Sequence, residues 1–209
     1  MNALTASAYM GCWDGQPVYV DLLQPDLSNV PWATLCRAVC GINRFNGVTT
    51  PLISVGGHSI RVMRRLREEM RVYGLLHDLH EGIMGDQTRP FRQAVGHVGP
   101  IGTLPIDTIE QRLQAAIHAK ADVPWPLPPL QQAMLEEADD WACQEELQHD
   151  KAGTLAERFG DETLTPHPKA FTRYVVAAIA EFHVNRSRAA QQRAEAMDAA
   201  LAATTTPTS

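Results

Sequence analysis

The segment YGLLHDLHEGIMGD, residues 73–86, combines a helical pattern with two histidines and three carboxylates. Imidazole and carboxylate groups are costly to remove from water unless they are paired or bind a metal. Two explanations are therefore open for this segment. It is either part of a paired or metal-bound cluster, or it is a solvated helix surface.

Helical spacing relates three of these side chains, His77, Asp78 and Glu81. Residues i and i+4 lie on the same side of a helix, and residue i+1 lies about 100° further round. His77 and Asp78 are therefore expected to flank one edge, with Glu81 one turn further on. Imidazole and carboxylate together suit a divalent transition metal, and a further carboxylate one turn away suits a base that acts on water.

Two ligands on one helix do not complete a metal site, so we searched for partners elsewhere in the chain. His58 lies on the apolar face of a helix predicted at 54–70, and Asp139 lies on a helix predicted at 130–150. Each of these buried polar groups would need a partner. A site with two histidines and two aspartates explains all four groups, and a site that keeps coordination positions open is catalytic rather than structural.

The rest of the chain predicts a nearly all-α single domain over residues 1–200. Residues 1–30 are expected to be irregular, with some strand character at 18–23, and residues 201–209 are expected to form a disordered tail. Ser54 is a plausible N-cap. Helices are predicted at 32–42, 54–70, 72–85, 109–120, 130–150 and about 169–200.

The last predicted helix carries more apolar surface than a solvated tail needs, at Phe171, Val175, Ile179 and Phe182. We expect this part to complete the core. The second half is rich in Ala, Gln, Arg and Glu, and we expect it either to project or to contact a partner chain.

Composition narrows the function classes. The 209 residues carry a net charge of −6, which argues against a general nucleic-acid binder, because such a protein needs a basic face. No run of about 18 apolar residues predicts a membrane span. The N-terminal residues MNALTASAYMGCWDG lack a signal-peptide pattern, so we expect a cytoplasmic protein whose four cysteines are reduced.

The order H…HD…D formed by His58, His77-Asp78 and Asp139 resembles the HD-domain metal-dependent phosphohydrolases. The resemblance covers about residues 40–150 and holds in order and spacing. It extends to RFNGVTTPLISVGGHS, which resembles the family's entry segment, to LLHDLHEGIMGDQTRPFR, which resembles its HDxxE…GD…P motif, and to EADDWACQEE, which resembles the stretch with the last aspartate.

This resemblance implies an HD-type helical bundle and a role for each matching residue. His58, His77, Asp78 and Asp139 would hold the metal, and Glu81 would orient or deprotonate the attacking water. For Glu81 the alternative is an exposed helix carboxylate. Asp86 resembles the family's substrate-side acid, and the alternative is that it caps a following turn.

The resemblance also implies a substrate-binding set. Arg44 would contact phosphate, because a guanidinium fork matches phosphate oxygens. Arg92 stands where relatives often have Lys, and Arg89 is a neighbouring candidate. Phe45 would lie against the sugar, where many relatives have Trp, and core packing is its alternative. His80, on the helix face away from His77, is expected at the surface or beside the ligands.

The short length, the RF pair at 44–45 and the GDxxxP segment at 85–90 resemble the small nucleotide-specific members of the family, namely bacterial 5′-deoxynucleotidases and phage dATP triphosphohydrolases. They imply hydrolysis of a deoxynucleotide, with a triphosphate favoured over a monophosphate, and a host-cytoplasmic location if the protein is phage-encoded. The alternative is a non-catalytic nucleotide-binding module, which belongs to a different class of function. The resemblance implies a homo-oligomer, either a dimer or a hexamer. Zn, Co, Mn, Ni or Fe would suit the ligands, with Mg assisting a triphosphate.

Overall fold

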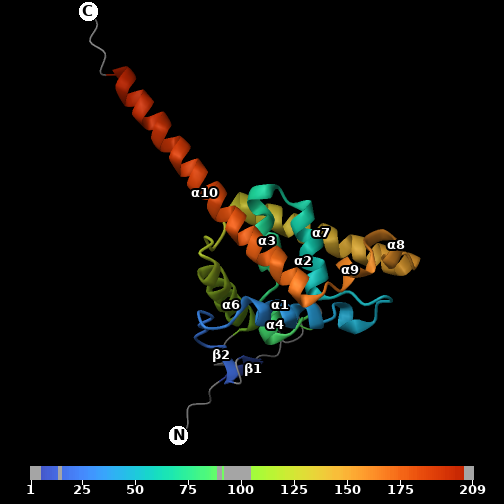
Figure 1. Cartoon of the computed structure of the whole chain (residues 1–209). Helices are drawn as coiled ribbons and strands as arrows, with labels where there is room; N and C mark the ends of the chain where they lie inside the picture. The colour runs from blue at the N-terminus through green and yellow to red at the C-terminus, as the bar shows by residue number, and fades with distance from the viewer. Residues whose placement is uncertain (1–5, 14–15, 89–90, 92–104, 205–209) are drawn as a thin grey trace, which may run out of the picture.

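The computed structural model describes residues 6–13, 16–88, 91 and 105–204 (Figure 1). Its helices confirm the all-α prediction. They are α1 (Trp32–Gly41), α2 (Val55–Arg65), α3 (Arg71–Leu76), α4 (Glu81–Met84), α6 (Ile106–Ala121), α7 (Pro129–Ala152), α8 (Leu155–Phe159), α9 (Asp161–Leu164) and α10 (Pro168–Thr204), with short 3₁₀ turns η1 (Phe45–Gly47) and η2 (Glu68–Met70).

The N-terminal segment is more regular than its sequence predicts. Strand β1 (Ser7–Trp13) pairs antiparallel with β2 (Gln16–Asp21), so the strand character expected at 18–23 is confirmed for 18–21, while the prediction of irregular structure is wrong for the rest of the hairpin. The register shifts by one residue between Tyr9 and Cys12, where Gly11 has a φ of 98° that favours glycine. This hairpin packs against α1 and α4, with Val20 buried beneath it.

Helix α2 lies at the centre of the bundle and packs against α1, α3 and α7 (Figure 1). Every residue from Val55 to Val62 is buried. Large apolar side chains from the surrounding helices complete the core: Leu35, Val39, Leu75, Leu76, Leu113, Ile117, Phe171 and Val175. Each such burial stabilises the fold by about 1.5–3 kcal/mol. The polar side chains that α2 carries are therefore held inside a rigid frame.

The start of α2 is fixed by contact with the backbone near the end of α9. Ser54 caps the helix as predicted, since its hydroxyl accepts from the Gly57 amide at 3.0 Å and donates to the Leu164 carbonyl at 3.1 Å. A Cβ atom at Gly57 would lie 2.1 Å from that carbonyl oxygen. Glycine is therefore required for this approach, one residue before His58.

Two predicted helices are interrupted in the structure. The helix predicted at 54–70 ends at Arg65, and only the turn η2 continues it, without a glycine or proline to mark the break. The helix predicted at 72–85 is divided by a tight turn at residues 77–80. In this turn the amides of Leu79, Glu81 and Gly82 bond three residues back rather than four.

The C-terminal helix α10 confirms the core prediction. Phe171 and Val175 are buried, Ile179 and Phe182 pack against the core, and α10 lies on α1 and α3. Its second half extends away from the bundle (Figure 1). The prediction of a disordered tail is wrong for residues 201–204, because α10 continues to Thr204, and residues 205–209 lie outside the described range.

Helices α8 and α9 were not predicted from the sequence. They follow α7, which ends at Gly153 with a φ of 67°, and are separated from each other by Gly160 with a φ of 73°. Among the described cysteines, Cys36, Cys40 and Cys143 are free thiols. In the described part of the chain, no helix has the length and apolar character needed to cross a membrane.

Candidate metal centre

His77 and Asp78 lie in the tight turn between α3 and α4. Nδ1 of His77 donates a 3.0 Å hydrogen bond to the Gly74 carbonyl oxygen. Because a carbonyl oxygen only accepts, Nδ1 carries a hydrogen and Nε2 is the nitrogen that remains for a metal. Nε2 is buried without a hydrogen-bond partner, although Oδ2 of Asp78 lies only 3.1 Å away.

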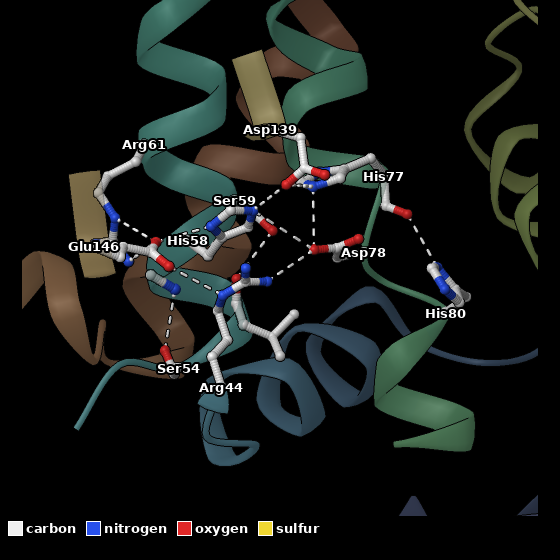
Figure 2. A network of polar contacts seen from close by, with 12 residues as sticks. Arg44, Ser54, His58, Ser59, Arg61, His77, Asp78, His80, Asp139 and Glu146 are labelled. Carbon is white, nitrogen blue, oxygen red and sulfur yellow. Dashed lines mark hydrogen bonds and ion pairs between the residues drawn. The ribbon is translucent and has the colours of Figure 1, made fainter. Parts of the chain in front are cut away.

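His58 on α2 and Asp139 on α7 approach the same point (Figure 2). Nε2 of His58 lies 2.7 Å from Oδ1 of Asp139 and 3.9 Å from Oδ2 of Asp78. Oδ1 of Asp139 lies 3.8 Å from Nε2 of His77. One ligand atom from each of the four residues therefore lies within 4.8 Å of the others, as the sequence predicts.

This cluster fits a single divalent transition metal. Nitrogen and oxygen ligands about 2.0–2.2 Å from one ion lie roughly 3–3.6 Å from each other. The observed separations of 2.7, 3.1, 3.8 and 3.9 Å bracket that range. An ion here would also bind Nε2 of His77, which is buried without a hydrogen-bond partner. Two imidazoles and two carboxylates suit several such metals, so the donor set does not identify one.

The four side chains differ in their access to solvent. The side chain of His58 is fully buried, that of His77 is 9% exposed and that of Asp78 is 14% exposed. The Asp139 side chain is 40% exposed. The cluster is therefore closed by protein on the α2 side and open beside Asp139, which is where water and a ligand can enter.

Electrostatics in the cluster favour ionised carboxylates. Burial acts to raise the pKa of Asp78, but the neighbouring His77 and His58 outweigh it and hold that pKa well below its usual range. Burial likewise opposes ionisation of Asp139, but the hydrogen bond from His58 and the neighbouring His77 hold its pKa well below its usual range. Both carboxylates are therefore ionised at neutral pH, which is the form that binds a cation.

Arg44 lies at the edge of the cluster with its guanidinium between two carboxylates. Its Nε donates to Oε2 of Glu146 at 3.1 Å, and its Nη1 lies 3.6 Å from Oδ2 of Asp78 (Figure 2). Burial acts to lower the pKa of Arg44, but Glu146 and Asp78 raise it above its usual value. A fixed positive charge therefore stands beside the metal ligands.

Glu146 was not predicted as a functional residue. It lies on α7 two turns after Asp139, is fully buried, and accepts from Nδ1 of His58 at 2.8 Å. Burial acts to raise its pKa, but the charge and hydrogen bond of His58, followed by Arg44 and Arg61, lower it to about 2. The available signal was its position seven residues after Asp139, on the same helix face.

Glu81 and Asp86 follow the turn that holds Asp78, Glu81 at the start of α4 and Asp86 just after its end. Glu81 is the first residue of α4, and its Oε2 is buried without a hydrogen-bond partner. Burial, followed by the charges of Asp78 and Asp86, raises the pKa of Glu81 well above its usual value. Burial also raises the pKa of Asp86. Glu81 is therefore not the exposed helix carboxylate of the alternative reading.

The structure describes only some of the residues that are predicted to bind substrate. Phe45 packs against a small apolar cluster of Ile53, Leu155 and Leu164, and the Arg44 guanidinium lies 5.3 Å from its ring centre. These contacts favour the core-packing alternative for Phe45, and contact with a sugar stays a prediction. Arg89 and Arg92 lie outside the described residues.

His80 is buried, so the surface alternative for it is wrong. Its Nδ1 lies 3.0 Å from the carbonyl oxygen of His77, which Gln114 on α6 also contacts. Burial lowers the pKa of His80. In Figure 2 its ring points away from the metal ligands. His80 therefore stabilises the backbone of the turn and is not a fifth member of the cluster.

Comparison with known proteins adds little about function. No protein-family profile matches the sequence. An uncharacterized protein of Rhodobacter capsulatus is 30% identical over 125 residues, which span 55% of this chain and 60% of that protein. The match thus covers less than two thirds of that relative's length, and its name states no activity. Any function for this chain must be argued from the residues of the cluster.

Proposed function

We propose that this protein is an HD-type metal-dependent phosphohydrolase that acts on deoxynucleotides. The observation that carries the proposal is the convergence of His58, His77, Asp78 and Asp139 from three separate parts of the fold. These are the four residues of the H…HD…D order. The opening beside Asp139, the buried Glu81 and the positive charge of Arg44 support a catalytic site over a structural one.

The residues around the cluster divide the chemistry between them. A divalent metal held by the four ligands would supply a Lewis acid for the attacking water and for a phosphoryl oxygen. Glu81 would take the proton of that water, since burial raises its pKa and so makes it a stronger base than an exposed glutamate. Asp86 would lie on the substrate side. Arg44 would stabilise negative charge on the phosphate.

The favoured reaction is that of a dATP-type triphosphohydrolase. Water would attack the α-phosphorus, the bond from that phosphorus to the 5′-oxygen would break, and deoxynucleoside and triphosphate would leave. Mg²⁺ would assist by binding the triphosphate. A 5′-deoxynucleotidase would use the same residues on a monophosphate. Either substrate belongs to the cytoplasmic nucleotide pool, which in a phage-infected cell is that of the host.

A panel of deoxy- and ribonucleotides at each phosphorylation state tests this proposal. Each nucleotide is incubated with protein loaded with Zn, Co, Mn, Ni or Fe, and the products are resolved by chromatography. Release of deoxynucleoside with triphosphate supports the favoured reaction. Release of inorganic phosphate from monophosphates only selects the 5′-deoxynucleotidase. Bound metal without turnover of any nucleotide would instead identify a binding module.

We also propose that the distal half of α10 pairs with a second copy of this chain. It extends from the bundle and carries exposed Val184 and Met197, which are 49% and 66% exposed. Arginines at 186, 188 and 193 precede acidic residues at 195 and 198. Antiparallel pairing of two such helices would bring opposite charges together.

Light scattering measures this assembly directly. We expect the full chain to be a homo-oligomer, and Met197→Lys to lower its mass, because a charge would replace an exposed apolar side chain on the distal half of α10. Lys151→Met, on the exposed end of α7, would leave the mass unchanged. A monomeric wild-type protein at working concentration would contradict the proposal.

A further inference from the structure

Glu146 lies behind the metal cluster and contacts it from the side opposite the opening. Its Oε1 lies 2.8 Å from Nδ1 of His58, and the same oxygen accepts from Nε and Nη2 of Arg61 at 2.8 and 2.6 Å. Its Oε2 accepts from Nε of Arg44 at 3.1 Å. The side chain is fully buried, so both oxygens are committed to protein partners (Figure 2).

The contact with His58 selects one ring nitrogen for the metal. An ionised carboxylate only accepts, so the hydrogen between Glu146 and His58 lies on Nδ1. Nε2 then faces Oδ1 of Asp139 and Oδ2 of Asp78. A carboxylate behind a ligating imidazole fixes the tautomer and orientation of the ring and raises the basicity of the ligating nitrogen.

The second oxygen of Glu146 orients the side chain of Arg44. Because Oε2 holds the Nε of Arg44, the far end of the guanidinium is directed to Asp78, where Nη1 lies 3.6 Å from Oδ2. One carboxylate therefore orients a histidine ligand through one oxygen and the neighbouring arginine through the other.

Stability alone gives little reason for this arrangement. Burying charged groups carries a desolvation cost, and apolar side chains of similar volume often replace a buried ion pair without loss of stability. A carboxylate kept only to neutralise Arg61 and Arg44 would also have no need to contact an imidazole. The bond to His58 is the feature that links Glu146 to the site.

We propose that Glu146 is a positioning residue that holds His58 in the Nδ1–H tautomer for metal binding and aligns Arg44 beside Asp78. The inference rests on the proposed function for its metal, but its test needs no nucleotide. Glu146→Gln keeps the shape of the side chain and removes its charge. Since one amide oxygen cannot serve all the donors, we expect metal affinity to fall about 10- to 100-fold.

The experiment measures zinc affinity by chelator competition, on full-length protein that circular dichroism shows to be folded. Arg61→Gln is the matched control inside the buried cluster, because it removes a charged partner of Glu146 but leaves the bond to His58. Glu137→Gln is the exposed control on α7. We expect both controls to keep the affinity of the wild type. An equal loss in Glu146→Gln and Arg61→Gln would overturn the inference, since it would show a general effect of the buried charges.

A second measurement uses the unmodified protein and stands even if Glu146→Gln fails to fold. Two-bond ¹⁵N–¹H spectra of the zinc-loaded protein, with His58 assigned by mutation, report which ring nitrogen carries the hydrogen. We expect hydrogen on Nδ1 and zinc on Nε2. Zinc on Nδ1 would overturn the inference.

The two proposals can fail separately. Wild-type zinc affinity retained by Glu146→Gln would overturn the inference and leave the phosphohydrolase proposal standing. Loss of zinc from Glu146→Gln in a protein that hydrolyses no nucleotide would support the positioning role and overturn the phosphohydrolase. A wild-type protein that binds no divalent metal would overturn both.

Discussion

Replacing Asp78 with asparagine is expected to remove bound metal and to abolish turnover while the helices persist. Asparagine keeps the size of the side chain but lacks the negative charge that His77 and His58 stabilise in Asp78. Oδ2 of Asp78 lies 3.1 Å from Nε2 of His77. Its loss should lower metal affinity by more than the 10- to 100-fold typical of a partner outside the ligand set.

Metal content by mass spectrometry, measured beside far-ultraviolet circular dichroism, checks this prediction. Asp122→Asn is a matched control, because Asp122 is 85% exposed and has a left-handed backbone that asparagine tolerates. The control should keep its metal. Near-normal metal and turnover in Asp78→Asn would show that the site is wrongly placed.

The metal ligands could be predicted because each is an exception to a local pattern. His58 interrupts the apolar face of α2, and Asp139 shares a face of α7 with buried Leu135 and Ala142. Such groups need partners, and the requirement for partners connects helices that are far apart in sequence. The need of each buried polar group for a partner therefore predicted which helices meet at the site. Helical periodicity alone could not predict this.

The local geometry of the HD turn could not be predicted from helical spacing. The sequence carries no proline in residues 73–86, yet α3 ends at Leu76. Side chains compete for its carbonyl groups, since His77 bonds to the Gly74 oxygen and His80 contacts the His77 oxygen. These contacts depend on tertiary packing against α6, which single-segment reasoning does not include.

Glu146 was missed for a related reason. A glutamate in the run EELQHD has the composition of a solvated helix face, and the groups that stabilise its charge, His58, Arg44 and Arg61, come from other elements. The hairpin of β1 and β2 was missed because its two strands, Ser7–Trp13 and Gln16–Asp21, alternate only weakly between apolar and polar residues. In both cases the contacts that stabilise the structure are made with residues outside the local segment.

Replacing Glu81 with glutamine is expected to separate chemistry from binding. Glu81 directly follows the turn that holds His77 and Asp78, and it has a buried oxygen without a hydrogen-bond partner. A residue that acts only on the attacking water affects the transition state more than the ground state. Glutamine cannot accept a proton, so kcat should fall by about 10²-fold or more, the usual effect of losing general acid–base catalysis.

Metal content and nucleotide affinity should stay near wild-type values in Glu81→Gln, because Glu81 is not one of the four clustered ligands. Single-turnover kinetics with metal analysis of the same sample measure all three quantities. Asp86→Asn is the informative comparison, since Asp86 also has a raised pKa. Release of metal from Glu81→Gln would make Glu81 a ligand. Unchanged kcat in Glu81→Gln together with a large loss in Asp86→Asn would assign the proton transfer to Asp86 instead.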